Sequence, residues 1–169
     1  MQRLAKPLGL AETRLRLSDE QARRLAPGHD EDGKPTSQWT FACMEGFGGL
    51  RSTAHDLLLF VDAASGRRKT PLAKAFRMAQ QPWRETFGGP NHGQSVGFCW
   101  FRDPLPWSKD DLIWQNGETG GYRSFLALIP EKEVGVVVLS NSRQHALGAI
   151  GMPILQKTIE DRNEAGPRR

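Results

Sequence analysis

Trp114-Gln115-Asn116-Gly117-Glu118-Thr119-Gly120-Gly121-Tyr122-Arg123-Ser124-Phe125 is the stretch around which the predicted fold is arranged. A short apolar run precedes it, and two strongly apolar runs follow it. Its three glycines within five positions allow a backbone to come close to another group. Polar side chains lie among these glycines, so the stretch predicts a sheet edge that presents N–H groups to a bound molecule.

Four apolar runs separated by turn residues predict an antiparallel sheet in the second half of the chain. The runs are residues 96–101, 112–115, 122–129 and 134–139. Short connections make such runs antiparallel neighbours. The last run is apolar on both faces, which predicts a central, buried strand. A closing helix is expected over residues 145–161, with glycines and a proline weakening its first turns.

Helix signals dominate the first half of the chain. Ser18 with Gln21 and Thr53 with Asp56 are predicted capping boxes. The predicted helices are residues 19–25, 54–64 and 71–81. A short strand is expected at residues 39–41 and a loop at residues 83–94. The glycines of residues 46–49 favour a tight turn over an anion cradle, because the G-K-[ST] ending of a P-loop is missing.

Composition and charge are those of one globular domain. The chain has 169 residues, 38% hydrophobic and 25% charged, with a formal net charge of +4. Its basic runs lack interleaved aromatic residues, which favours a solvated surface over a nucleic-acid site. No apolar run approaches the roughly 20 residues of a membrane span. Cys43 and Cys99 form no C-x-x-C pair, although a bridge between them stays open, and the four histidines lack ligand spacing. We expect neither a metal nor a cofactor.

Four motifs occur in a fixed order along the chain. They are PLGL at residues 7–10 with Thr13, GGLRSTAHDL at 48–57, GETGGY at 117–122 and VGVVVLSN at 134–141. Each is weak alone, but their order and spacing resemble the serine β-lactamase and penicillin-binding-protein family, most of all class C β-lactamases. The resemblance covers residues 4 to about 159. It implies an α/β fold of the α+β type, in which an antiparallel sheet is flanked by helices.

The resemblance also implies a serine mechanism. A Ser in S-x-x-K attacks the acyl carbonyl, a Y-x-N segment supplies a second acid/base group, and a K-T-G or H-x-G strand lines the far side. Every serine of this chain lacks a Lys three residues later, and its single Tyr is followed by Arg123 and Ser124. Only the third motif is therefore expected here. Residues 4–10 resemble the tail of a helix already under way, so we expect a missing N-terminal half.

The resemblance places Gln115, Asn116 and Gly117 on the K-T-G segment. Gln115 stands where Lys or His is usual, and its neutral amide lacks the charge that attracts a substrate carboxylate. This favours an esterase- or peptidase-like parent. The backbone N–H of Glu118 matches the second oxyanion-hole donor, while its side chain is either a surface carboxylate or must point away from the oxyanion. The implied substrate-binding residues are Thr119, Gly120 and Tyr122.

Several side chains near the motifs have a structural alternative. Tyr122 and Arg123 are expected to pack and pair at the sheet edge, with substrate contact as the alternative. Asp56 is expected to be the cap carboxylate of its helix rather than an acid/base group. Three tryptophans are expected in the core, with a cleft lining as the alternative: Trp100, Trp107 and Trp114.

These inferences predict a single partial domain over residues 1–169. It divides into a helical and loop region, 1–95, and antiparallel strands with a C-terminal helix, 96–161. The predicted function is that of the C-terminal part of a β-lactamase-like serine hydrolase, which when complete acts on a β-lactam, ester or D-amino-acid peptide. The implied partners are that substrate and the N-terminal half, without nucleic acid, cofactor or membrane span. The alternative function is a non-catalytic remnant or binding module.

Overall fold

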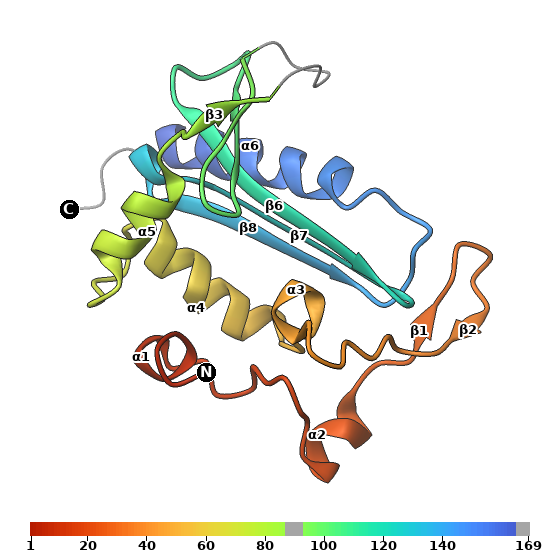
Figure 1. The fold of residues 1–169 in the computed structure, drawn as a ribbon. Helices are drawn as coiled ribbons and strands as arrows, with labels where there is room; N and C mark the ends of the chain where they lie inside the picture. The colour runs from red at the N-terminus through yellow and green to blue at the C-terminus, as the bar shows by residue number, and fades with distance from the viewer. Residues whose placement is uncertain (87–92, 165–169) are drawn as a thin grey trace.

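The computed structural model describes residues 1–86 and 93–164 and places one antiparallel sheet between helices (Figure 1). The helices are α1 (Ala5–Leu8), α2 (Asp19–Arg24), α3 (Glu45–Gly48), α4 (Ala54–Ala64), α5 (Ala73–Gln80), the 3₁₀ turn η1 (Pro130–Lys132) and α6 (Gly148–Glu164). The sheet contains, in spatial order, β3 (Arg84–Glu85), β4 (Ser95–Val96), β5 (Phe101–Pro104), β6 (Asp111–Thr119), β7 (Tyr122–Ile129) and β8 (Val134–Ser140). A separate hairpin pairs β1 (Gly28–His29) with β2 (Pro35–Thr36).

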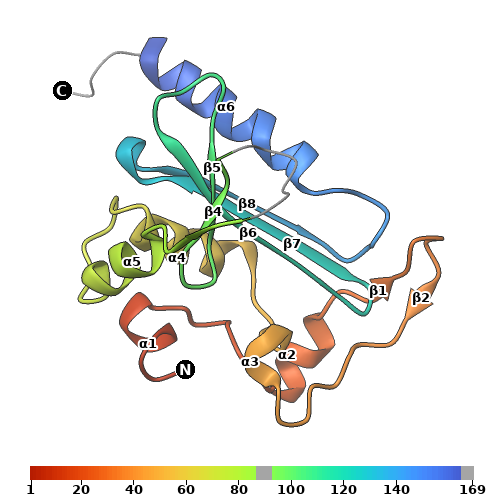
Figure 2. The ribbon, with the colours of Figure 1, turned by 45° about the horizontal axis from the view of Figure 1, so that its top comes forward.

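Each face of the sheet packs against one long helix, α4 on one side and α6 on the other (Figure 2). On the α4 face, Val61 packs with Ile113 and Leu128. On the α6 face, Leu155 packs with Phe125. Consecutive strand residues point to opposite faces, so β6, β7 and β8 contribute to both clusters. This arrangement confirms the predicted fold class.

The strands on either side of the glycine-rich stretch form as predicted. β7 coincides with the predicted run 122–129, and β8 extends the run 134–139 by one residue. β6 is longer than predicted, because the strand continues through the polar residues to Thr119. Tertiary pairing with β7 therefore determines the end of β6 more than the apolar pattern does.

The predicted single strand 96–101 is wrong, because Val96 ends β4, Phe101 begins β5, and residues 97–100 form the hairpin turn between them. Gly97 donates its N–H to Trp100 O at 2.9 Å, and Cys99 adopts a positive φ of 61°. The N–H of Phe98 bonds instead to Ala79 O at 2.8 Å, at the end of α5. Contact with that helix thus bends a run whose apolar composition is typical of a strand.

Three further expectations need correction. Residues 39–41 are not a strand, since the pairing falls on β1 and β2. β8 packs between α4 and α6, with Val134 and Val136 buried, but it lies at the edge of the sheet in the described part of the chain. The apolar composition of this run predicts that both faces of the strand are covered. A helix on each side covers them, so a second neighbouring strand is not needed. The sheet also begins earlier than residue 96, because β3 lies inside the predicted loop 83–94.

The helix boundaries follow their caps. Ser18 and Gln21 form the predicted capping box of α2. At α4, Thr53 Oγ1 accepts the N–H of Asp56 at 3.2 Å, but the reciprocal bond of a capping box is replaced. The Asp56 carboxylate instead accepts the N–H of Glu12 at 2.8 Å. The prediction that Asp56 caps its own helix is therefore wrong. Its carboxylate bonds to Glu12, 44 residues earlier, and so ties α4 to the N-terminal segment.

The remaining helices agree with the predictions in outline. The glycine-rich residues 46–49 overlap the single turn α3, which begins at Glu45, and Gly49 donates to Glu45 O at 2.8 Å. α5 begins two residues after Pro71, and α6 begins at Gly148 and contains Pro153 within it. The predicted tail beyond residue 164 and the middle of the loop 83–94 lie outside the described residues.

Candidate functional site

The third-motif residues lie on a strand that has a neighbour on one side only. β5 pairs with β6 from Asp111 to Trp114 and then diverges, whereas β7 pairs with β6 as far as Thr119 (Figure 2). In the described part of the chain, residues 115–119 therefore have no strand beside them on the β5 side. The segment is an open strand edge, because its outward backbone groups have no partner strand among the described residues.

Two features indicate that the N–H of Glu118 points to this open edge. Gly120 and Gly121 form a two-residue turn that closes on the Thr119–Tyr122 pair, so bonds to β7 fall on every second residue before it. Asn116 donates its N–H to Gln115 Oε1 at 3.0 Å rather than to β7. Since N–H groups two residues apart point the same way, Glu118 is directed outward as well.

The side chains of the motif alternate between the two faces of the sheet. Ile113 lies in the α4 cluster and Trp114 packs against the α6 cluster. The same alternation places Gln115, Gly117 and Thr119 on the α4 side, and Asn116 and Glu118 on the α6 side. The residues predicted for the site are therefore adjacent along the edge but serve different faces.

Gln115 uses both ends of its side-chain amide locally. Its Nε2 donates to Cys99 O at 2.9 Å, and its Oε1 accepts the N–H of Asn116. The side chain thus ties the β4–β5 turn to β6. It presents no positive charge at a position where the related family uses one.

The carboxylate of Glu118 points away from the α4 side and is neutralised by two arginines. Oε2 accepts Arg123 Nε at 2.7 Å, and Oε1 accepts Arg143 Nε at 2.6 Å. Burial is the largest influence and raises the pKa, but the hydrogen bonds and charges of both arginines outweigh it, so the pKa of Glu118 is lowered from 4.5. The side chain is therefore a paired carboxylate and not a negative charge facing the outward N–H.

A groove of about 760 Å³ opens on the α4 side of the edge. The sheet contributes Gln115, Gly117 and Ser124 to it. The opposite wall comes from the segment around α3, with Trp39, Phe41, Phe47 and Arg51. A Cβ on Gly117 would lie 3.0 Å from Ser124 Oγ, so the glycine keeps the floor of this groove open.

A second groove of about 760 Å³ opens on the α6 side. Its aromatic wall contains Trp107, Trp114 and Phe125. Trp114 donates its indole N–H to Asp103 at 3.0 Å. Both grooves are lined by Asn116 and Gly117, so the open edge of β6 lies between them. Trp100 is in the core as predicted, whereas Trp107 and Trp114 line this groove.

Tyr122 packs as expected, but at the turn end of the β6–β7 hairpin rather than at a sheet edge, because β7 lies between β6 and β8. Its hydroxyl donates to Ala26 O at 2.8 Å, and a Cβ on Gly28 would lie 2.9 Å from its ring. Burial raises the pKa of this hydroxyl. The group is therefore an anchor for the β1–β2 hairpin rather than a free acid/base. Gly120 holds residues 37–39 in place, since a Cβ there would lie 2.5 Å from Ser37 O.

Sequence reasoning missed several residues of the site. Arg143 and Glu31 join the Glu118 cluster, with Arg143 Nη2 at 2.8 Å from Glu31. Trp39 and Arg51 were not predicted as a groove wall. No spacing signal connects these residues with the motif, because β8 and the β1–β2 hairpin bring them together only in the fold.

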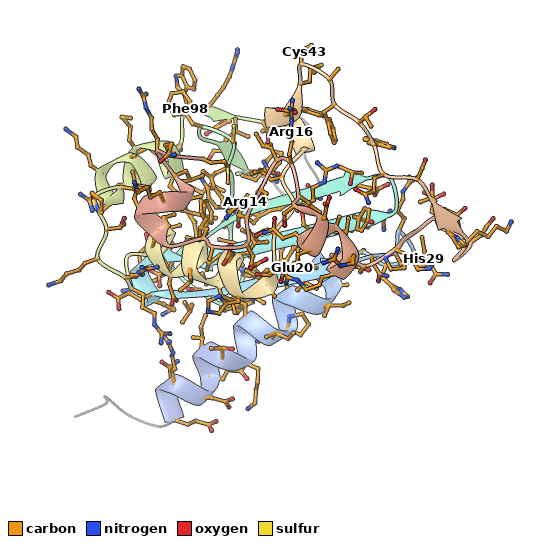
Figure 3. The ribbon with its side chains drawn as sticks, turned by 90° about the horizontal axis from the view of Figure 1, so that it is seen from below. Arg14, Arg16, Glu20, His29, Cys43 and Phe98 are labelled. Carbon is orange, nitrogen blue, oxygen red and sulfur yellow. The ribbon has the colours of Figure 1, made fainter. Side chains whose placement is uncertain are left out.

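The described residues contain neither a cluster of metal-ligating side chains nor a disulfide. No group of three or more His, Cys, Asp or Glu side chains there could hold a metal ion. Cys43 and Cys99 are both exposed and free, so they form no bridge. Figure 3 shows Cys43 on a loop apart from the turn marked by Phe98. No helix in this part of the chain is long and apolar enough to cross a membrane.

Comparisons with known proteins address the family and the fold of the chain. The model of the Beta-lactamase family matches residues 1–155. A beta-lactamase of Lysobacter lactamgenus is 27% identical over 164 residues, covering 82% of this chain and 43% of that protein. The D-alanyl-D-alanine-carboxypeptidase/endopeptidase AmpH of Escherichia coli (strain K12) is 24% identical, covering 82% of this chain and 37% of that protein.

Solved structures show the same fold. The beta-lactamase from Sulfitobacter sp. EE-36 superposes with a TM-score of 0.81 at 20% identity, covering 96% of this chain and 53% of that chain. The chain thus spans less than half the length of the curated relatives it matches, and about half of this solved structure. The family model covers most of the chain, and the motifs of residues 7–13, 48–57, 117–122 and 134–141 lie within it. The chain belongs to the Beta-lactamase family.

Proposed function

We propose that the open edge of β6 forms one wall of an acyl-serine hydrolase site, with the N–H of Glu118 as an oxyanion donor. The observation that carries this proposal is the outward N–H at the position after the third motif, on a strand edge between two grooves. A backbone donor needs no particular side chain, so Glu at this position is compatible with the role. Membership of the Beta-lactamase family supports the reaction class.

The proposed chemistry is addition followed by elimination. A serine Oγ forms a bond to the carbonyl carbon of an ester or amide, and its proton passes to a neighbouring base. The carbonyl oxygen becomes an oxyanion, which Glu118 N–H stabilises by hydrogen bonding. The C–O or C–N bond then breaks, the leaving group takes the proton, and water hydrolyses the acyl-serine. The sequence holds neither S-x-x-K nor Y-x-N, so residues outside it, in an N-terminal half, would supply those groups.

The proposed substrate is a small-molecule or peptide acyl compound. Gln115 offers no charge to a carboxylate, because its amide is engaged with Cys99 O and Asn116 N. This favours esters and peptides over substrates held by their carboxylate. The Thr119 side chain and the Tyr122 ring line the α4-side groove and would contact the substrate there, and Gly120 would support that contact by holding the wall at residue 37.

The second candidate is a non-catalytic remnant or binding module. It is favoured by the missing nucleophile and by the engaged Gln115. Under this alternative the two grooves bind ligands without turnover. The same experiment separates the two functions.

The test is co-expression with an upstream polypeptide that carries S-x-x-K and Y-x-N, followed by assays with a chromogenic ester and a chromogenic cephalosporin. Hydrolysis is expected, with an acyl-serine detectable by mass spectrometry on the upstream polypeptide. Glu118→Pro removes the donor N–H at a position where β7 takes no bond from it, and should abolish turnover. Glu118→Ala keeps the N–H and is the matched control, with partial activity. Equal rates for the two variants, or no turnover in the folded complex, would contradict the proposal.

A further inference from the structure

We propose that the Glu118 side chain is a positioning residue for its own backbone N–H, acting through a charged cluster on the opposite face of the sheet. The cluster consists of Glu118, Arg123, Arg143 and Glu31. This inference rests on the proposed function of Glu118 N–H as an oxyanion donor. It assigns the carboxylate a role that its distance from the reacting face would otherwise leave unexplained.

The cluster joins three segments that are remote in sequence. Glu118 lies on β6, Arg123 on β7, Arg143 in the loop after β8, and Glu31 in the β1–β2 hairpin. Each carboxylate oxygen of Glu118 takes a different arginine, at 2.7 Å to Arg123 Nε and 2.6 Å to Arg143 Nε. Such charge-assisted bonds from two fixed planar groups define the direction of the side chain.

The arginines are themselves anchored. Arg123 donates its Nη1 to His145 O at 2.9 Å, and Arg143 Nη2 lies 2.8 Å from Glu31. The backbone N–H of Arg143 also donates to His29 O at 3.1 Å. Figure 3 shows His29 on the β1–β2 hairpin. The backbone N–H of His29 bonds to Gly121 O, in the β6–β7 turn, at 3.3 Å. The Glu118 carboxylate is thus bonded to groups that have fixed positions of their own.

The open edge of β6 explains why the charged cluster is needed to hold the Glu118 N–H in position. Beyond Trp114, β6 has β7 as its only strand neighbour in the described part of the chain, and on the β5 side the Gln115 side chain bonds to Cys99 O in the β4–β5 turn. The turn that ends the hairpin consists of two glycines, and Gly121 has a φ of 76°. Glycines give the backbone at this strand end more conformational freedom than other residues would, and no second strand restrains it within the described residues. An oxyanion donor must be oriented before the reaction. Because β5 does not restrain this part of β6, the charged cluster on the α6 side restrains it instead.

The charges within the cluster balance. Two carboxylates face two guanidinium groups, and the side chains of Glu118, Arg123 and Arg143 are 38%, 24% and 31% exposed. Exposed ion pairs contribute little to global stability. The expected effect of breaking the cluster is therefore local, at the end of the β6–β7 hairpin, and not a loss of the fold.

The experiment uses the ¹⁵N-labelled 169-residue chain with Glu118→Gln. Removing the charge takes the carboxylate away from Arg123 and leaves Arg143 with Glu31 as its remaining carboxylate partner in the cluster, while the two guanidinium groups stay near one another. The order parameter of the residue 118 N–H should fall from about 0.85 toward 0.6 or below, while the N–H of Ile113 keeps its value. The urea midpoint should change little. Asp32→Asn is the matched control, because it removes one charge from the exposed pair with Lys34 in the same β1–β2 hairpin.

Arg143→Gln is a second variant that breaks the cluster from the other side, and it should lower the same order parameter. In the complex with the upstream polypeptide, Glu118→Gln should lower kcat about tenfold with KM nearly unchanged, because only the developing oxyanion uses the N–H. An order parameter and kcat equal to those of Asp32→Asn would overturn the inference. If the native complex shows no turnover, the proposed function fails. The order parameters alone then decide whether the charged cluster restrains the residue 118 N–H.

Discussion

The hydroxyl of Thr13 donates a 2.7 Å hydrogen bond to Oδ2 of Asp56, a residue 43 positions later, and both side chains are buried. The same oxygen accepts the N–H of Glu12. Ser52 Oγ lies 2.8 Å from Thr13 Oγ1 and extends the cluster. Two of the sequence motifs, at residues 7–13 and 48–57, therefore meet at one buried carboxylate that joins the N-terminal segment to α4.

Thr13→Val should destabilise the chain, because valine keeps the shape but removes a donor from a buried carboxylate. We expect a loss of about 1–3 kcal/mol in the free energy of unfolding. Urea denaturation followed by circular dichroism measures it. Thr158→Val is the control, since its hydroxyl bonds to Ile154 O within α6 and its loss should cost little. Equal midpoints for the two variants would show that the Asp56 cluster does not carry stability.

Gly135→Ala tests the contact between β8 and α4. A Cβ at this position would lie 2.2 Å from Val61 Cγ1 and 3.0 Å from Ala127 O. The helix and strand would have to separate, at a cost of about 1–3 kcal/mol. The matched control is Gly46→Ala, where a Cβ meets nothing within 4 Å. Thermal denaturation should show a lower Tm for the first variant only. A Tm for Gly135→Ala as high as that of the control would mean that α4 does not approach β8 this closely.

The elements that the sequence predicted well are those whose signal is local. The cap at Ser18 and the mostly apolar run of β7 lie within a few residues of the structure they specify. The turn at residues 97–100 was missed because its cause is distant, in the bond from Phe98 N to Ala79 O. The edge position of β8 was missed for a related reason, since burial between two helices and burial between two strands produce the same composition.

The candidate site was predictable in part. Its backbone elements, from Gln115 to Gly121, follow from the glycine spacing and the family resemblance. The direction of the Glu118 side chain follows from strand alternation once the register is known. Its partners do not, because Arg143 is 25 residues away and reaches Glu118 only through the β7–β8 hairpin. The segment around Trp39 likewise becomes a wall only through packing against Gly120.

The chain without a partner should form no acyl-enzyme. None of its serines has a lysine three residues later, so no hydroxyl is paired with a base of the family type. Incubation with a fluorescent penicillin or a fluorophosphonate, followed by mass spectrometry, should show only the unmodified mass. A stoichiometric adduct on any serine, mapped by peptide analysis, would contradict this expectation. A complete class C β-lactamase treated in parallel verifies that both probes are reactive.

Glu118 should make stability depend on acidic pH. Its pKa in the folded chain is lowered, against the raising effect of burial, by hydrogen bonds from Arg123 and Arg143. A carboxyl whose pKa is lower in the folded than in the unfolded chain contributes stability above the unfolded value near 4.5, and this contribution is lost as the pH falls through the folded value. Because the side chain is 38% exposed, solvent screening keeps the contribution modest.

The measurement is the free energy of unfolding in urea at a series of pH values from 7 to 3, for the native chain and for Glu118→Gln. The native chain should lose stability more steeply below about pH 4.5 than the variant, because only the native chain takes up a proton at this site. Asp32→Asn should follow the native curve. Parallel curves for the native chain and Glu118→Gln would mean that the two arginines do not hold the carboxylate in its charged form.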